Sequence, residues 1–145
     1  MKLKAATAVR TKVAQTVSPP QWYWDDIEHG WVVEIPKLSR SINRTHGTHW
    51  SIQRKEREEW ARWLGVARDK PPKAVGRRRL LIHRFSCSDG LDRDNLYGSY
   101  KQLIDAIKAA GLIVDDSDEW LDLIIVNERA ETRADAHTLI VLGEA

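Results

Sequence analysis

The feature that most constrains the fold of this chain is a strongly periodic helix that follows a dense apolar strand. Residues 79–86 have the apolar density of an interior strand, and residues 96–110 place apolar side chains at 3.6-residue spacing. Gly111 then provides a natural end for the helix. Because a further strand is expected at about 120–127, the centre of the sequence predicts a strand, a helix and a returning strand.

Shorter elements are predicted on either side of this centre. Residues 31–35 are typical of a strand that Pro36 stops, residues 50–66 have a helical pattern, and short strands are expected at 112–114 and 137–142. Two main helices and several strands predict an α+β fold, with a mixed β-sheet in one domain over residues 31–145. Residues 1–30 are expected to form a basic arm or extension, since residues 1–20 contain no acid.

Composition narrows the classes of protein to consider. The chain is 42% hydrophobic and 30% charged, which excludes a disordered tail or a collagen-like repeat. No stretch approaches the roughly 20 apolar residues of a membrane span. A single cysteine, Cys87, excludes an internal disulfide framework. We therefore expect a cytoplasmic protein without a membrane partner.

Charge is divided between the two halves of the sequence. Residues 1–84 hold 18 basic and 8 acidic side chains and residues 85–145 hold 5 and 13, which gives net charges of +10 and −8. A basic half favours binding to an anionic polymer, although a fold that intermixes the halves would explain the same division. The candidate phosphate contacts lie in or beside the most basic segments: Arg40, Asn43, Arg44, His49, Arg54, Lys55, Arg77, Arg78 and Arg79.

An acidic loop separates the apolar strand from the periodic helix. Asp92 and Asp94 form a D-x-D pair, whose carboxylates lie on the same side of an extended chain, about 6–7 Å apart. Such a pair suits one hard cation, and Mg²⁺ fits better than Ca²⁺ because the EF-hand pattern is absent. For Asp94 alone, a helix cap is the simpler explanation. A second pair, Asp115 and Asp116, follows the helix, and we expect the returning strand to bring both acidic loops to one edge of the sheet.

Lys101 and three tryptophans are further candidates. Lys101 lies two helical turns beyond Asp94, so the expected helix places it on the same face as the acidic loop. A solvated ion pair with Asp105, one turn further on, is the simpler explanation. The side chains of Trp22, Trp24 and Trp31 suit base stacking or a dimer surface, and core packing is an equal alternative.

The order of these motifs along the chain resembles that of a known family. Residues 92–96 (DRDNL) precede Lys101, residues 103–106 (LIDA) and residues 111–117 (GLIVDDS), and residues 35–50 supply an Ile-Pro, a Ser-Ile-Asn and a Thr-His-Trp. In this order they resemble the RusA-type Holliday-junction resolvases, which are common in phages and prophages. The resemblance covers roughly residues 31–142. One departure is that the family's lysine follows D-x-D-N after two residues, where this chain has Gly98.

The resemblance implies a homodimeric endonuclease of DNA recombination and repair, which resolves four-way junctions with Mg²⁺ or, in its place, Mn²⁺. It implies that Asp92, Asp94 and Asp116 bind the metal, with Asp115 as a neighbour, and that Lys101 is the catalytic lysine. The cytoplasm of a bacterial host, with a phage or prophage origin, is the setting that it implies. Two alternatives stay open: cleavage of other branched DNA such as flaps or forks, and a catalytically idle phage DNA-binding protein.

Overall fold

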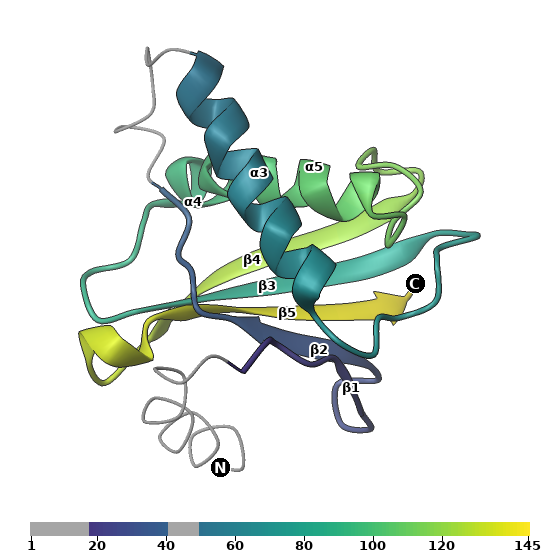
Figure 1. Ribbon diagram of the computed structural model, residues 1–145, viewed down its shortest axis with the longest axis horizontal. Helices are drawn as coiled ribbons and strands as arrows, with labels where there is room; N and C mark the ends of the chain where they lie inside the picture. Colours follow the sequence, from purple (N-terminus) through teal and green to yellow (C-terminus); the bar gives the residue numbers. More distant parts are fainter. Residues whose placement is uncertain (1–17, 41–49) are drawn as a thin grey trace.

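The computed structural model describes residues 18–40 and 50–145, and it shows a five-stranded mixed sheet with helices packed on one face (Figure 1). The elements, in chain order, are β1 (Tyr23–Asp25), β2 (Gly30–Ile35), α3 (Trp50–Val66), β3 (Arg78–Ser86), α4 (Arg93–Ser99), α5 (Lys101–Ala109), β4 (Leu121–Arg129), the 3₁₀ helix η2 (Arg133–Asp135) and β5 (His137–Glu144). The α+β class with one mixed sheet is therefore confirmed.

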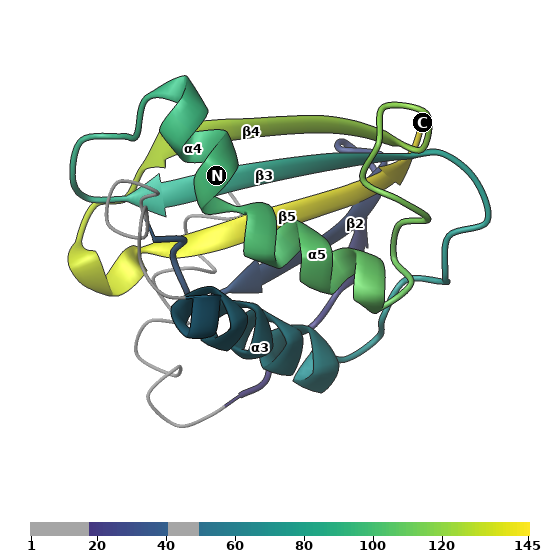
Figure 2. The same cartoon turned by 90° about the horizontal axis from the view of Figure 1, so that it is seen from above.

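The strands lie in the order β1-β2-β5-β3-β4. Only β3 and β4 are parallel, with Arg78 level with Leu121 and Ser86 level with Arg129, and the other neighbours are antiparallel. Because β3 and β4 run in the same direction, α4 and α5 return the chain along the length of the sheet (Figure 2). We call the end where β3 and β4 finish the carboxyl edge, and the end where they begin the amino edge.

The main core lies between the helices and one face of the sheet. Along β3, alternate residues are buried, so Leu80 and Ile82 point into the core while their neighbours are only partly buried. Trp60 of α3 is fully buried, and its ring centroid lies 6.0 Å from that of Tyr100. Burial of each large apolar side chain of this kind contributes about 1.5–3 kcal/mol, which makes this layer the principal source of stability.

Several predicted elements are confirmed and one is wrong. The helix predicted at 50–66 is α3, and the strands predicted at 31–35, 79–86, about 120–127 and 137–142 are β2, β3, β4 and β5. Residues 112–114 form no strand. Gly111 has a φ of 80° and ends the helix, after which Leu112 and Ile113 are buried in the turn that follows. The apolar run at 112–114 reflects core packing of an irregular segment.

The helix predicted at 96–110 is broken in two at Tyr100. That residue has φ −100° and ψ 8°, its ring is buried, and its hydroxyl lies 2.7 Å from the Thr138 hydroxyl of β5. Just before it, the Ser99 hydroxyl donates to the Leu96 carbonyl, a contact that competes with the helical ladder. Gly98 weakens the helix further. The break therefore follows from anchoring Tyr100 to the sheet.

The domain begins earlier in the chain than residue 31. Trp22 is 2% exposed and belongs to the core, and β1 pairs with β2 through Tyr23, Trp24 and Asp25. The assignment of residues 18–30 to an extension is therefore wrong, because these residues are part of the folded domain. Residues 1–17 lie outside the described residues.

Candidate functional site

The Asp92–Asp94 pair lies at the carboxyl edge, where β3 passes into α4. Asp92 is the N-cap of α4: its backbone is extended, and its carboxylate accepts the Asn95 N–H at 2.9 Å. Asp94 lies in the first turn of α4, so the predicted extended D-x-D arrangement, with both carboxylates on the same side of the chain, is wrong. Both acids are exposed. The cap that was expected at Asp94 is thus made by Asp92, so the carboxylate of Asp94 takes no part in that bond. Negative charge is favoured at this position, beside the positive end of the helix.

The loop that carries the pair is held to the neighbouring strand. The Asn127 side chain of β4 accepts the Leu91 N–H at 3.3 Å and donates to the Leu91 carbonyl at 2.8 Å. A Cβ at Gly90 would lie 2.6 Å from Asn127 Cγ, so glycine permits this close approach. The Tyr97 hydroxyl of α4 accepts the Ile125 N–H at 3.1 Å. These contacts present two carboxylates on a fixed loop.

The second acidic pair lies at the amino edge and is engaged differently. Asp115 Oδ1 lies 2.7 Å from Lys108 Nζ at the end of α5. This hydrogen bond to Lys108, aided by one from Ser117, lowers the pKa of Asp115 to about 2, and Asp115 in turn raises the pKa of Lys108. Asp116 is exposed beside it. Asp115 is therefore the partner of a lysine.

The prediction that both acidic loops meet at one edge of the sheet is wrong for a single chain. The parallel pairing of β3 and β4 places the loop after β3 and the turn before β4 at opposite ends, as Figure 2 shows for the two ends of the α4–α5 layer. A helical segment of that length, Arg93–Ala109, spans about 25 Å. Within residues 18–40 and 50–145, no three His, Cys, Asp or Glu side chains are grouped to hold a metal ion.

Lys101 opens α5 and is 66% exposed at its side chain. Its amine lies 3.6 Å from the Asp105 carboxylate, so the simpler of the two explanations for this residue, a solvated pair one turn apart, is observed. The argument that Lys101 and Asp94 share a face of one helix is wrong, since the break at Tyr100 separates them.

Three consecutive arginines at the start of β3 were predicted to bind phosphate, and they have different surroundings. Arg78 is 2% exposed and contacts Glu144 at 3.4 Å, so its prediction as a DNA contact is wrong. Arg79 is partly buried and donates to the Glu28 carbonyl at 2.9 Å. Arg77 is exposed, and its Nε donates to the Asp118 carbonyl. Most of this group serves to hold the amino edge together.

Three other predicted DNA contacts remain available at the surface. Arg54 and Lys55 are exposed in the first turns of α3, which begins at the carboxyl-edge end of the molecule (Figure 2). Arg40 has a side chain 56% exposed, with its Nε 3.6 Å from Glu56. Asn43, Arg44 and His49 lie outside the described residues. The exposed predicted cations therefore include three at the same end of the molecule as the Asp92–Asp94 loop.

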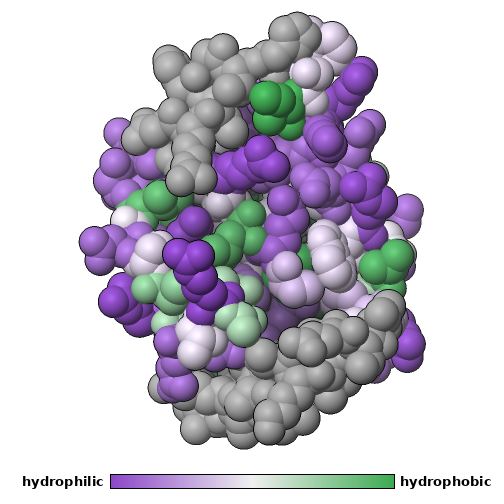
Figure 3. Space-filling model, turned by 60° about the vertical axis from the view of Figure 1, so that its left-hand side comes forward, coloured by the Kyte–Doolittle hydropathy of each residue, from purple (hydrophilic) through white to green (hydrophobic). Residues whose placement is uncertain are grey.

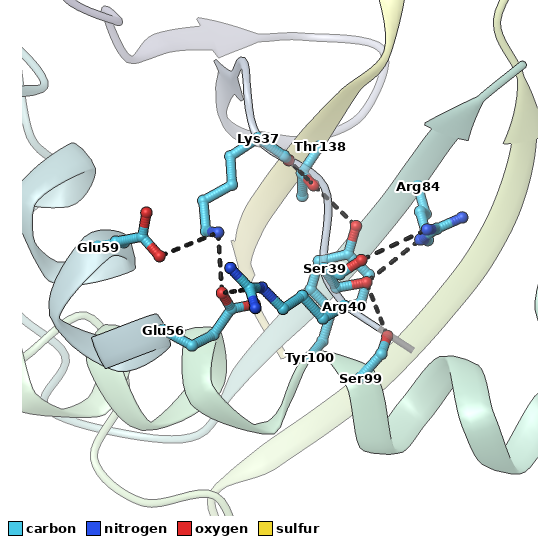
Figure 4. A network of polar contacts seen from close by, with 9 residues as sticks. All are labelled: Lys37, Ser39, Arg40, Glu56, Glu59, Arg84, Ser99, Tyr100 and Thr138. Carbon is cyan, nitrogen blue, oxygen red and sulfur yellow. Dashed lines mark hydrogen bonds and ion pairs between the residues drawn. The ribbon is translucent and has the colours of Figure 1, made fainter. Parts of the chain in front are cut away.

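A polar network beneath this edge was not predicted (Figure 4). Lys37 forms an ion pair with Glu56 of α3 at 2.9 Å. Arg84 of β3 donates a hydrogen bond to the Ser39 hydroxyl. The Ser39 hydroxyl is also hydrogen-bonded to the Ser99 hydroxyl, at 2.7 Å. The helix and strand periodicity of the sequence indicates that both Glu56 and Arg84 point inward. Glu56 lies one turn before Trp60 on its buried stripe, and Arg84 continues the inward alternation of β3.

The side of the molecule that carries the carboxyl edge is largely hydrophilic. In Figure 3, the described residues of this face are mostly hydrophilic, and the hydrophobic ones among them are separated by hydrophilic side chains. The described part of this face is therefore better suited to a polar or charged partner than to a hydrophobic one. The predicted tryptophans lie elsewhere: Trp22 packs in the core, and Trp24, which is 50% exposed in β1, contacts Trp31 edge-to-face at 5.1 Å.

Comparison with known proteins adds no family to this geometry. No protein-family model matches the sequence, and no curated protein matches it. In the described part of the chain, no helix has the length and apolar character needed to cross a membrane. The fold and the site define an α+β protein with an exposed carboxylate pair at the carboxyl edge of its sheet, and the resemblance to RusA-type resolvases stays a prediction.

Proposed function

We propose that the protein is a Mg²⁺-dependent endonuclease that cuts branched DNA, four-way junctions above all, as a homodimer. The observation that carries the proposal is the exposed Asp92–Asp94 pair, held on a fixed loop at the carboxyl edge. Proteins bind Mg²⁺ through one or two carboxylates together with waters and substrate phosphates. The pair meets that minimum, and Mn²⁺ has the same preference for oxygen ligands.

The position of the pair also supports this function. In open α/β sheets, ligands bind beyond the carboxyl ends of the parallel strands, where Asp92 and Asp94 lie. Mg²⁺ bound there would neutralise charge on a phosphodiester and lower the pKa of a bound water. Arg54 and Lys55, exposed at the same end, would attract the phosphate backbone without reading its sequence. Lys101, with its exposed amine, is the proposed catalytic lysine.

A homodimer would account for Asp116, which lies at the opposite edge. A two-fold axis beside the helix layer reverses the direction of α4 and α5 in the partner, so the carboxyl edge of one subunit can face the amino edge of the other. Asp92 and Asp94 would then lie near Asp116 of the partner subunit. Such a dimer has two equivalent sites, as paired cuts in a nearly two-fold symmetric junction require. The three acids would form a metal site between subunits.

The second candidate is a catalytically idle DNA-binding protein. Two observations favour it: Asp92 already caps α4, and Lys101 already pairs with Asp105. On this account the exposed cations bind DNA, and the acids have only local structural roles. Cleavage of flaps or forks by the same acids is an alternative within the nuclease class.

Cleavage of synthetic substrates separates these candidates. The chain is incubated with a four-way junction, a flap and a plain duplex, in Mg²⁺ or in chelator. The proposal expects Mg²⁺-dependent cutting of the junction above the other two substrates. Preferred cutting of the flap would support the alternative nuclease, and binding of the junction without cutting of any substrate would support the idle protein.

An aspartate substitution locates the site. Asp94→Asn keeps the shape of the side chain and removes one charge, so we expect it to bind the junction and not to cut it. Asp122→Asn, an exposed aspartate of β4 with no proposed role, is the matched control and should cut at the wild-type rate. If Asp94→Asn cuts as fast as this control, the site is assigned to the wrong residues.

A further inference from the structure

Three charged side chains are buried among the described residues: Glu56, Arg78 and Arg84. They differ in whether an oppositely charged side chain lies beside them. Glu56 lies 2.9 Å from Lys37, and Arg78 lies 3.4 Å from Glu144. Arg84, at 8% exposure, has no carboxylate of the described residues within 4.0 Å. Since residues 1–17 and 41–49 contain neither Asp nor Glu, no side-chain carboxylate of the chain balances Arg84.

The hydrogen bonds of Arg84 are few and long. Its Nε donates to the Ser39 hydroxyl at 3.2 Å, and its Nη2 donates to the Ser39 carbonyl at 3.4 Å, against a usual length of about 2.9–3.0 Å. Nη1 is shielded from solvent and has no hydrogen-bond partner among the described residues. Figure 4 shows the guanidinium reaching beyond Ser39, with one nitrogen turned away from the rest of the network. Most of its five N–H donors are therefore poorly used.

A buried cation in this condition favours an anionic partner. Burying a charge is costly unless it is paired and hydrogen-bonded, and one weakly held serine does little to offset that cost. The planar fork of a guanidinium matches the oxygens of a phosphate and can donate two parallel hydrogen bonds to it. Phosphate is thus the ligand whose charge and geometry fit the unused donors.

We propose that Arg84 binds a phosphate group, which takes the place of its long contacts to Ser39. The proposal requires Ser39 to move aside and admit an anion to Arg84, and the next residue, Arg40, has a side chain that is 56% exposed. Ser99, against Ser39, ends α4 while Asp92 begins it, about 10 Å away. A phosphate on Arg84 would therefore flank the one beside the acidic pair. That the phosphate belongs to DNA rests on the proposed function; the anion site itself does not.

Thermal unfolding with inorganic phosphate tests the anion site. The melting temperature of the full chain is measured in rising phosphate, with chloride at equal ionic strength as the reference, for wild type, Arg84→Met and Arg62→Met. Arg62 is an exposed arginine of α3, so its variant matches the change in charge. We expect phosphate to raise the melting temperature of wild type and Arg62→Met more than that of Arg84→Met. An equal rise in all three would reflect only the general effect of an excluded salt, and would overturn the proposal.

Arg84→Met should fold, because it replaces an unbalanced charge by an apolar side chain of similar length. If it does not fold, Arg84→Lys decides. That variant keeps the positive charge and loses the planar guanidinium, so we expect phosphate to raise its melting temperature by less than that of wild type. A rise as large as in wild type would overturn the role of the guanidinium.

Junction binding identifies the source of the phosphate. By fluorescence anisotropy, Arg84→Met should bind a labelled four-way junction roughly ten- to a hundredfold more weakly than Arg62→Met, the usual loss for one charge-assisted contact. An Arg84-dependent phosphate effect with unchanged junction binding would overturn the assignment to DNA and leave a site for free phosphate. Failure to cut any junction, with both Arg84 effects present, would contradict the nuclease proposal alone.

Discussion

The two ends of β3 each carry a buried arginine on the same face of the sheet, and the two arginines differ in their bonding partners. At the amino edge, Arg78 contacts Glu144, donates to the Leu112 carbonyl at 2.9 Å and lies 5.1 Å from the ring centroid of Trp31. At the carboxyl edge, the hydrogen bonds of Arg84 within the described part of the chain are its two long contacts to Ser39. The amino edge supplies Arg78 with an acidic partner, whereas at the carboxyl edge the described residues supply Arg84 with none.

The acidic residues repeat this difference. At the amino edge, Asp115 is bound by Lys108 at 2.7 Å. At the carboxyl edge, Asp92 is engaged through a backbone N–H, and Asp94 is exposed. Among the described residues, the carboxyl edge therefore combines an exposed carboxylate, Asp94, with a buried arginine, Arg84, that no carboxylate balances. This is the end where a metal ion and a phosphate backbone would bind together.

The largest expected effect tests whether the carboxyl edge can tolerate a further unbalanced charge. Lys37→Met removes the closest partner of the buried Glu56 and, within the described part of the chain, leaves it Arg40 as its cation, at 3.6 Å. Breaking a buried pair costs about 3–5 kcal/mol, so the free energy of unfolding in urea should fall by about that amount. The control is Glu59→Gln, which loosens a more exposed contact to Lys37 at 3.7 Å and should cost less than about 1 kcal/mol. Similar small losses in both variants would show that Glu56 is not dependent on Lys37.

The next effect compares the two buried arginines directly. Arg78→Met removes an ion pair, a bond to a buried carbonyl and a stacking contact, and should lower the free energy of unfolding by about 2–3 kcal/mol. Arg84→Met removes a poorly bonded charge and should change it by less than about 1 kcal/mol. Urea unfolding of both variants under the same conditions gives the two values. If Arg84→Met is the more damaging variant, the contrast between the edges is wrong.

The position of these buried charges was partly readable from the sequence. The stripe containing Trp60 and Leu64 predicts α3 over 50–66 because helix periodicity is local, and the same period places Glu56 inward. Alternation along β3 likewise places Arg84 on the core face. Whether each charge finds a partner depends on strands and helices distant in sequence. Glu144, which balances Arg78, lies 66 residues further along the chain.

The placement of the two acidic loops could not be predicted because it depends on strand direction. Residues 92–94 and 115–116 flank one helical segment, and the sequence does not show which way β4 runs beside β3. Parallel pairing sends the loops to opposite edges. The break at Tyr100 depends on a contact with Thr138, 38 residues away. Local elements were therefore predictable, and the geometry of the candidate site was not.

The smallest expected effect concerns the titration of the amino edge. Asp115 has a folded-state pKa of about 2, below its ordinary value of 3.8, because Lys108 stabilises its charged form. Its contribution to stability is therefore present above about pH 4 and is lost as the pH falls through about 2. Carboxyl NMR signals should show a midpoint near 2 for Asp115, and Lys108→Met should return it toward 3.8. An unchanged midpoint in Lys108→Met would remove the ion pair as the cause.

The proposed nuclease site is shared between two subunits, with Asp94 from one and Asp116 from the other. Asp94→Asn and Asp116→Asn should each fail to cut a four-way junction in Mg²⁺. When the two variants are mixed and allowed to exchange subunits, half of the dimers are mixed, and each mixed dimer has one intact site. The mixture should therefore recover about a quarter of the wild-type sites.

Cleavage of a labelled four-way junction by that mixture is the most direct measurement. We expect recovered activity that yields nicked junctions in place of paired cuts, because each mixed dimer has a single working site. Absence of cutting by the mixture, with junction binding and subunit exchange both demonstrated, would contradict a site shared between the two edges. Absence of cutting by the wild type under the same conditions would contradict the nuclease function itself.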